Sequence, residues 1–345
     1  MSTPGRATAE GTARFRARHA GAVATDHFRD FAGLSLSSVG LGTYLGPIDD
    51  AADARYQAAI ARALELGINV VDTAINYRHQ RSERAVGRAL AAAAAAGVGR
   101  DEIVVATKGG FVPHDAADPD AGRDHVDRTY RKSGIIGPDE LVAGCHCLAP
   151  RYLADQIARS RRNLGVDTID IYYLHNPETQ LEDIGSHELM HRLRAAFEVL
   201  ERARSDGAIG WYGTATWSAF REPAGRPSHL DLFAIEAQAR AVAGDRHGFR
   251  VVQLPLNQRM AEASEIRTQG RGADQLTALE AARELGLYVM ASASILQGKL
   301  ATEPGAAAAA IDWVRTRPGL GTALVGMGRP EHVDADAAAF RRPAR

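Results

Sequence analysis

Four side chains of the kinds that transfer protons stand at or near the ends of short apolar runs. Asp72, Lys108 and His175 each directly follow such a run, and Tyr77 lies five positions after Asp72. An acid, a lysine, a histidine and a tyrosine brought to one place can donate a proton to a carbonyl oxygen. This chemistry requires that the four side chains meet in the fold.

Each member of this set has an expected role. The phenol of a free tyrosine titrates near ~10, and a nearby ammonium favours the phenolate, so Lys108 is expected to lower the pKa of Tyr77 toward neutrality. An ionised Asp72 would hold the ammonium and offset the desolvation of a partly buried charge. His175 would orient the carbonyl group by a hydrogen bond.

The elements that carry these residues alternate along the chain. Eight short β-branched or apolar runs predict strands, at residues 36–41, 69–72, 103–107, 169–174, 209–214, 250–254, 287–291 and 322–326. Segments with helical periodicity follow them, at residues 50–66, 82–96, 150–164, 188–206, 230–243, 273–285, 305–316 and 330–340. Glycines such as Gly165 stand just past several helix ends, where a left-handed residue is favoured.

Eight strand–helix units predict an α/β fold, a single-domain (β/α)8 TIM barrel over residues 31–345. A doubly wound sheet would carry G-x-G-x-x-G after its first strand, whereas Gly40-Leu41-Gly42 is not followed by a helix start. Residues 1–30 are expected to form a disordered extension. The long polar segment 109–149 after strand three is expected to be a loop that covers the substrate.

In such a barrel the active site forms at the carboxyl ends of the strands. Asp72, Lys108 and His175 close the second, third and fourth predicted strands. The barrel therefore predicts that these three side chains and Tyr77 converge on one rim.

Composition limits the partners. Of 345 residues, 45% are hydrophobic and 24% charged, and the net charge is −1, which argues against nucleic-acid and anionic-membrane binding. No apolar run is long enough to span a membrane. With two cysteines, Cys145 and Cys147, a cytoplasmic protein with a small-molecule partner is expected. The oligomeric state leaves no trace in the sequence.

The string Asp72-Thr73-Ala74-Ile75-Asn76-Tyr77, followed by Ser82-Glu83 and Gly87, resembles the second-strand signature of the aldo-keto reductases. Thr107-Lys108 and the segment 174–178 resemble the ends of that family's third and fourth strands. The resemblance extends from about Leu34 to Ala339. It implies a (β/α)8 barrel that binds NADP(H) without a Rossmann motif, a carbonyl substrate, and a catalytic tetrad of Asp72, Tyr77, Lys108 and His175.

The resemblance also implies a nucleotide site, with some departures. Gln253 matches the glutamine that contacts the nicotinamide carboxamide. The family's Ser-Asn pair after strand five is replaced by Ala215-Thr216, and Ser292 stands where an aromatic residue usually stacks on the ring. Trp217 is a candidate to fill that space. Ile295 and Gln297 continue the same nucleotide-binding segment.

After the last strand, the segment 326–336 resembles the family's loop and helix around the adenosine phosphate. Gly326, Gly328, Arg329, His332 and Asp336 are the residues implied there. A helix N-terminus and an arginine favour a phosphate. Asp336 stands in place of an asparagine, so its negative charge would disfavour the 2′-phosphate of NADPH.

Three classes of function are candidates for this chain. An NADPH-dependent carbonyl reductase, with Tyr77 as the general acid, fits the set of four residues. A slow-turnover nucleotide-binding regulatory protein on the same barrel would fit the departures at Ala215, Thr216 and Ser292. A metal-dependent hydrolase is disfavoured because strand one lacks H-x-H, and Cys145-His146-Cys147 has poor spacing for zinc, so no metal is expected.

Overall fold

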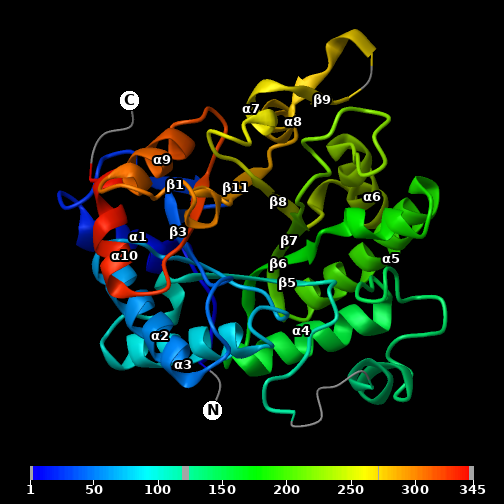
Figure 1. Ribbon diagram of the computed structural model, residues 1–345, viewed down its shortest axis with the longest axis horizontal. Helices are drawn as coiled ribbons and strands as arrows, with labels where there is room; N and C mark the ends of the chain where they lie inside the picture. The colour runs from blue at the N-terminus through cyan, green and yellow to red at the C-terminus, as the bar shows by residue number, and fades with distance from the viewer. Residues whose placement is uncertain (1–2, 119–123, 271, 342–345) are drawn as a thin grey trace.

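A closed barrel of parallel strands occupies the centre of the computed structural model, which describes residues 3–118, 124–270 and 272–341 (Figure 1). Around the barrel the strand order is β11-β12-β3-β4-β5-β6-β7-β8, and β8 pairs with β11 to close it. The barrel strands are β3 (Val39–Gly42), β4 (Val70–Asp72), β5 (Val104–Gly109), β6 (Ile169–His175), β7 (Ile209–Ala215), β8 (Phe249–Pro255), β11 (Tyr288–Ser292) and β12 (Thr322–Gly326). The predicted (β/α)8 barrel is confirmed.

Helices surround these strands in Figure 1. They are α2 (Asp50–Glu65), α3 (Arg81–Ala95), α4 (Pro150–Leu164), α5 (Ser186–Ser205), α6 (Leu232–Ala243), α8 (Ala278–Glu284), α9 (Ala306–Arg315) and α10 (Pro330–Asp336). Helix α4 shows how the sequence sets such bounds. Pro150 occupies its first turn, where no backbone N–H is needed, and Gly165 ends it with a φ of 62°.

Two apolar layers form because side chains alternate across each strand. Val70, Val104 and Ile171 belong to the cluster that fills the barrel. Their chain neighbours Val71, Val105 and Tyr172 belong to the larger cluster between strands and helices. Along each strand, every second residue therefore faces the barrel interior, and the residues between them face the helices.

The expectation that residues 1–30 are disordered is wrong for the part that the structure describes. Residues Ala9–His19 form helix α1, and Thr8 caps it by accepting a hydrogen bond from the Gly11 amide. Thr12, Phe15 and His19 form its buried face, and Phe15 is fully buried. Because these residues are spaced three and four apart, they form one continuous face of the helix. Polar residues stand between them in the sequence, so the amphipathic pattern is weak.

The N-terminal segment also covers the barrel at the end where the strands begin. The Ala7 amide donates a hydrogen bond to the buried Asp170 carboxylate at 2.8 Å. A hairpin of β1 (Phe28–Phe31) and β2 (Leu34–Ser37) adds Leu34 and Leu36 to the interior cluster. The first predicted strand, 36–41, is therefore two elements, because its first half belongs to this hairpin and the barrel strand begins at Val39.

We expect the variant Phe15→Ala to lower the free energy of unfolding by about 3–5 kcal/mol, since it removes a fully buried ring and leaves a cavity. Urea unfolding followed by circular dichroism measures this. Arg16→Ala, on the exposed face of the same helix, is the matched control and should change stability by less than about 0.5 kcal/mol. Equal effects of the two changes would contradict the packing of α1.

Two further segments differ from the predicted pattern. The helix predicted at 273–285 begins at Ala278, after a small excursion of α7 (Glu262–Glu265), β9 (Arg267–Gln269) and β10 (Leu276–Thr277). Residues 110–149 join β5 to α4. Tyr130 and Ile136 of this connection are buried in the outer core, so much of it packs against the barrel.

Candidate active site

Three of the predicted site residues point into the barrel at the carboxyl ends of its strands. Asp72, Lys108 and His175 lie an even number of positions after Val70, Val104 and Ile171, which face the barrel interior. Alternation along each strand therefore sends all three side chains inward at its carboxyl end. The structure brings them together as the sequence predicted.

The Lys108 side chain is fully buried and paired. Its Nζ donates to Asp72 Oδ2 at 2.6 Å and to the Thr73 carbonyl at 2.8 Å. Gln253 Nε2 donates to the other carboxylate oxygen, Asp72 Oδ1, at 2.8 Å. Burial lowers the pKa of Lys108, and the charge of Asp72 opposes this shift. The pair keeps a cation at the base of the site.

Tyr77 lies in the loop after β4, packed between rings. The Tyr77 ring centre is 4.9 Å from that of Tyr44, 5.8 Å from that of His175 and 5.1 Å from Lys108 Nζ. Burial raises the pKa of Tyr77 well above its ordinary value, and the charge of Asp72 adds to the rise. The expectation that Lys108 lowers the pKa of Tyr77 toward neutrality is therefore wrong, and at neutral pH the phenol carries its proton.

His175 is held in its neutral form. Burial lowers its pKa well below the ordinary value, and the positive charge of Lys108 lowers it further. Its Nδ1 atom is buried and has no hydrogen-bond partner among the described residues. A neutral imidazole beside Tyr77 can donate one hydrogen bond to a ligand oxygen.

His146 supports His175 from behind. His146 Nε2 lies 2.7 Å from the His175 carbonyl oxygen, and Gln180 Nε2 lies 2.8 Å from His146 Nδ1. Since the Gln180 amide donates to Nδ1, the proton of His146 is assigned to Nε2. Gly110 makes room: its φ is 143°, and a Cβ there would lie 2.8 Å from His146 Nε2.

The sequence does not indicate this contact of His146, which stands there only as part of a cysteine-flanked triplet. No pattern links residue 146 to residue 175, because a loop brings them together. Among the residues that the structure describes, no group of three His, Cys, Asp or Glu side chains could hold a metal ion. Nor is any helix in those ranges long and apolar enough to cross a membrane.

A cavity of about 890 Å³ opens beside these residues. Asp72, Tyr77 and His175 line it, and so do nine of the predicted nucleotide residues: Ala215, Thr216, Gln253, Ser292, Ile295, Gln297, Gly326, His332 and Asp336. Gly328 and Arg329 do not line it, and Arg329 is exposed at the start of α10. The structure thus joins the four-residue cluster to most of the predicted nucleotide site in one space.

Several cavity residues were not predicted, among them Tyr44, Leu45, Asn76, Phe111 and Asn176. Asn176 directly follows His175, so the strand-end argument could have included it. Tyr44 and Phe111 stand on loops whose course the sequence does not indicate. Trp217 also lines the cavity, as does Ser292, which contributes no aromatic ring.

Asp336 is a buried carboxyl group in the wall of this cavity. Burial raises the pKa of Asp336 to about 7, from an ordinary value near ~3.9. At pH 7 the group is therefore close to half ionised, and its charge in this part of the cavity depends on pH.

A sequence profile of the aldo/keto reductase family matches residues 38–222, which is more than half of the chain. The chain belongs to the aldo/keto reductase family. The matched span contains Asp72, Tyr77, Lys108 and His175, and it ends before Gln253 in β8 and before the parts of the predicted nucleotide site that begin at the ends of β11 and β12.

Relatives with curated names match over shorter lengths. D-threo-aldose 1-dehydrogenase of a Pseudomonas species is 31% identical over 209 residues, 59% of this chain and 57% of that protein. The NADH-specific methylglyoxal reductase of Escherichia coli is 32% identical over 148 residues, 41% of this chain and 39% of that protein. The chain thus spans about half the length of these relatives.

Solved structures share the fold over nearly the whole chain. An aldo/keto reductase from Klebsiella pneumoniae, crystallised with NADP and acetate, aligns with a TM-score of 0.60 at 19% identity, covering 93% of this chain and 91% of that one. A glycerol dehydrogenase from Gluconobacter oxydans aligns with a TM-score of 0.62 at 20% identity, covering 93% and 92%. At such identities the likeness shows the barrel fold.

Proposed function

We propose that this chain reduces the carbonyl group of an aldehyde or ketone with NADPH, and that Tyr77 is the general acid. The observation that carries the proposal is a protonated phenol and a neutral imidazole on one cavity wall, beside the buried Lys108–Asp72 pair. Membership of the aldo/keto reductase family supports it.

The residues present fit a nicotinamide nucleotide. The cavity lies in the upper part of the size range of small-molecule sites. Asn76 Oδ1 and His175 Nδ1 are buried without a partner among the described residues, so a polar ligand group would satisfy them. Gln253, Thr216 and Ser292 also line the cavity and supply uncharged polar groups. When bound, the nicotinamide supplies a hydride to the carbonyl carbon.

The chain's own residues handle the proton. As negative charge develops on the carbonyl oxygen, Tyr77 donates its hydroxyl proton to it and His175 donates a hydrogen bond. The ammonium of Lys108 balances the negative charge that the phenolate then carries. Asp72 holds that ammonium at 2.6 Å, so the cation stays in place through the step.

Loss of the absorbance of reduced nicotinamide tests the proposal. Purified protein with chelator is mixed with NADPH and a panel of aldehydes and ketones, including methylglyoxal and an aldose, the substrate classes named for the two relatives. Oxidation that needs both protein and carbonyl compound is expected. Tight NADPH binding without turnover on any compound would instead favour a nucleotide-binding regulatory protein, which the departures at Ala215, Thr216 and Ser292 allow.

Asp336 predicts how nucleotide binding varies with pH. Below pH 7 the carboxyl group is mostly protonated and neutral, and above pH 7 it is a carboxylate that repels the 2′-phosphate of NADPH. We expect NADPH to bind roughly tenfold more weakly at pH 8 than at pH 6, a difference of about 1.4 kcal/mol. Asp336→Asn should remove most of this difference, as fluorescence titration would show.

NADH, which lacks the 2′-phosphate, is the control ligand and should show a much smaller change between the two pH values. A dependence that persists in Asp336→Asn would contradict the assignment. The same carboxyl group affects folding, because its pKa in the folded state lies above its unfolded value. Its ionisation therefore weakens stability as the pH rises from about 4 to 7.

A further inference from the structure

The three residues after Tyr77 all have left-handed backbone conformations. Their φ angles are 48° at Arg78, 53° at His79 and 68° at Gln80. None of them is glycine, and other L-residues rarely adopt such angles. Strained segments of this kind persist only where surrounding contacts hold them. The contacts that hold this turn therefore also determine where Tyr77 lies.

Arg78 makes most of these contacts, and its side chain is only 2% exposed. Its Nε donates to the Pro47 carbonyl at 2.8 Å. Its Nη2 donates to the Asp49 carbonyl at 3.2 Å and to Asp53 Oδ1 at 2.7 Å. The guanidinium also lies 5.4 Å from the centre of the Tyr56 ring. Arg78 thus ties the turn to the start of α2 and to the loop before it.

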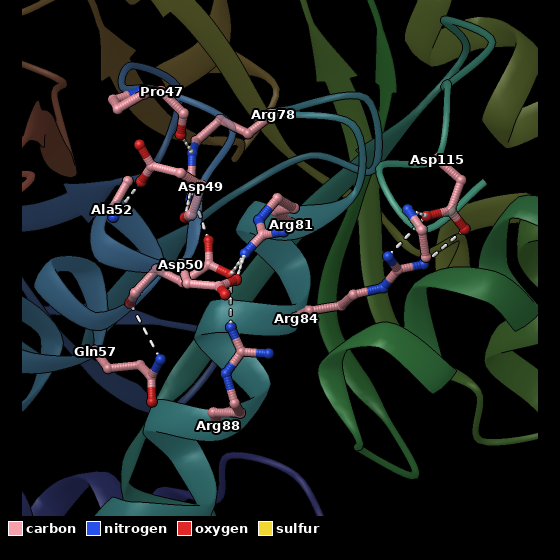
Figure 2. Close-up of polar contacts among 12 residues, drawn as sticks. Pro47, Asp49, Asp50, Ala52, Gln57, Arg78, Arg81, Arg84, Arg88 and Asp115 are labelled. Atoms are coloured by element: carbon pink, nitrogen blue, oxygen red, sulfur yellow. Dashed lines mark hydrogen bonds and ion pairs between the residues drawn. The ribbon is translucent and has the colours of Figure 1, made fainter. Parts of the chain in front are cut away.

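Asp53 is the buried anchor of this arrangement. Besides Arg78, it accepts hydrogen bonds or ion pairs on Oδ2 from Arg81 and Arg88, both at 2.8 Å. Burial raises the pKa of Asp53, but the bonds from Arg81 and Arg78 outweigh it and leave the pKa below its ordinary value. Figure 2 shows the three arginines turned toward the same place between α2 and α3. The carboxylate stays charged and fixed.

The far side of the turn is held as well. Gln80 Nε2 donates to the His114 carbonyl at 3.1 Å, and Gln80 Oε1 accepts from Asn163 at 3.0 Å. Arg84 forms a two-pronged ion pair with Asp115 at 2.7 and 2.8 Å, also visible in Figure 2. The connection between β5 and α4, which carries Phe111 into the cavity, is therefore tied to helix α3.

Tyr77 has no comparable anchor of its own. Its ring packs on Tyr44 and His175, and none of the side-chain hydrogen bonds that the described residues form involves its hydroxyl. Tyr44 belongs to the same loop as Pro47, to which Arg78 is bonded. Arg78 therefore fixes both the turn that carries Tyr77 and the loop that packs against it.

We propose that Arg78, through its ion pair with Asp53 and its bond to the Pro47 carbonyl, is a positioning residue that keeps the Tyr77 hydroxyl aligned with Lys108 and His175. The inference rests on the proposed reductase function. It assigns a role to the residue after the general acid, outside the set of four.

Arg78→Gly is the direct test, because glycine adopts the same φ without strain and removes only the anchor. We expect kcat for carbonyl reduction to fall by about 10- to 100-fold through misplacement of the hydroxyl. The dissociation constant of NADPH, measured by fluorescence, should stay within about twofold of wild type, because Arg78 does not line the cavity. The alkaline limb of kcat should move to lower pH, since a looser, better-solvated phenol loses part of its raised pKa.

Arg88→Gln is the matched control. Arg88 binds the same carboxylate at 2.8 Å but belongs to α3 and is 48% exposed. Its loss should leave kcat within about twofold and the alkaline limb in place, because an exposed partner contributes little. If Arg88→Gln lowered kcat as much as Arg78→Gly, the effect would come from Asp53 alone and the proposal would fail.

Thermal melting shows whether Arg78→Gly folds. If it does not, Arg78→Lys decides, because lysine keeps a cation near Asp53 but lacks the forked donors that also reach the Pro47 carbonyl. A smaller fall in kcat, with the alkaline limb again moved to lower pH, supports the proposal. Wild-type values of both kcat and the alkaline limb overturn it. Tyr77→Phe is run in parallel. An inactive Tyr77→Phe beside a fully active Arg78 variant overturns only this inference, whereas a fully active Tyr77→Phe overturns the proposed function and the inference with it.

Discussion

Tyr77→Phe is expected to slow carbonyl reduction by about 10²- to 10⁴-fold, the usual contribution of a general acid. The change removes only the hydroxyl oxygen, and the ring keeps its contacts with Tyr44 and His175. Affinity for NADPH should therefore change little. Single-turnover reduction of an aldehyde at saturating NADPH measures the chemical step directly.

Lys108→Met should cost nearly as much, and the two losses should not add. Without Lys108 the negative charge of Asp72 has no buried cation beside it and raises the pKa of Tyr77 further, which makes the phenol a weaker acid. Because both changes disable the same proton transfer, the double variant should be little slower than either single one.

Tyr172→Phe is the matched control for the loss of a phenol hydroxyl. Tyr172 is fully buried in the layer between strands and helices, and its hydroxyl has no partner among the described residues. Its reduction rate should stay within about twofold of wild type, as for a change away from the reacting groups. Independent, multiplying losses at Tyr77 and Lys108 would argue against a shared proton transfer.

Asp72→Ala is expected to destabilise the fold by about 3–5 kcal/mol, because it leaves the fully buried Lys108 without its partner. The lysine can reduce this penalty by releasing its proton. Its folded pKa then lies still further below the unfolded value, so the unfolded state binds more protons and stability rises with pH. The loss should be larger at pH 6 than at pH 9 in urea unfolding.

The double variant Asp72→Asn with Lys108→Met separates stability from activity. Removing both charges eliminates the unpaired buried ion, so most of the stability should return. Reduction should stay as slow as in Lys108→Met, because the cation beside Tyr77 is gone. A double variant less stable than Asp72→Ala would show that the pair contributes more than mutual charge compensation.

The barrel and the core of its site follow from local patterns. Alternating strands and helices predict eight units, and the same alternation places Asp72, Lys108 and His175 on inward-facing positions at three strand ends. Tyr77 follows from the resemblance of residues 72–77 to a known signature. Such features are readable because periods of two and 3.6 residues depend on near neighbours in the chain.

Contacts across long separations were decided by the tertiary structure alone. His146 reaches the His175 carbonyl because the chain turns at Gly110, and α1 is ordered because Phe15 meets a core built from later elements. In the left-handed turn after Tyr77, Arg78 is bonded to Asp53, which lies on helix α2 and 25 residues earlier in the chain. The raised pKa values of Tyr77 and Asp336 were likewise decided by the tertiary structure, because burial causes both shifts. Residue types fix which protons can move, but how strongly each group is shielded from water depends on segments far away in the sequence, which only the folded chain brings together.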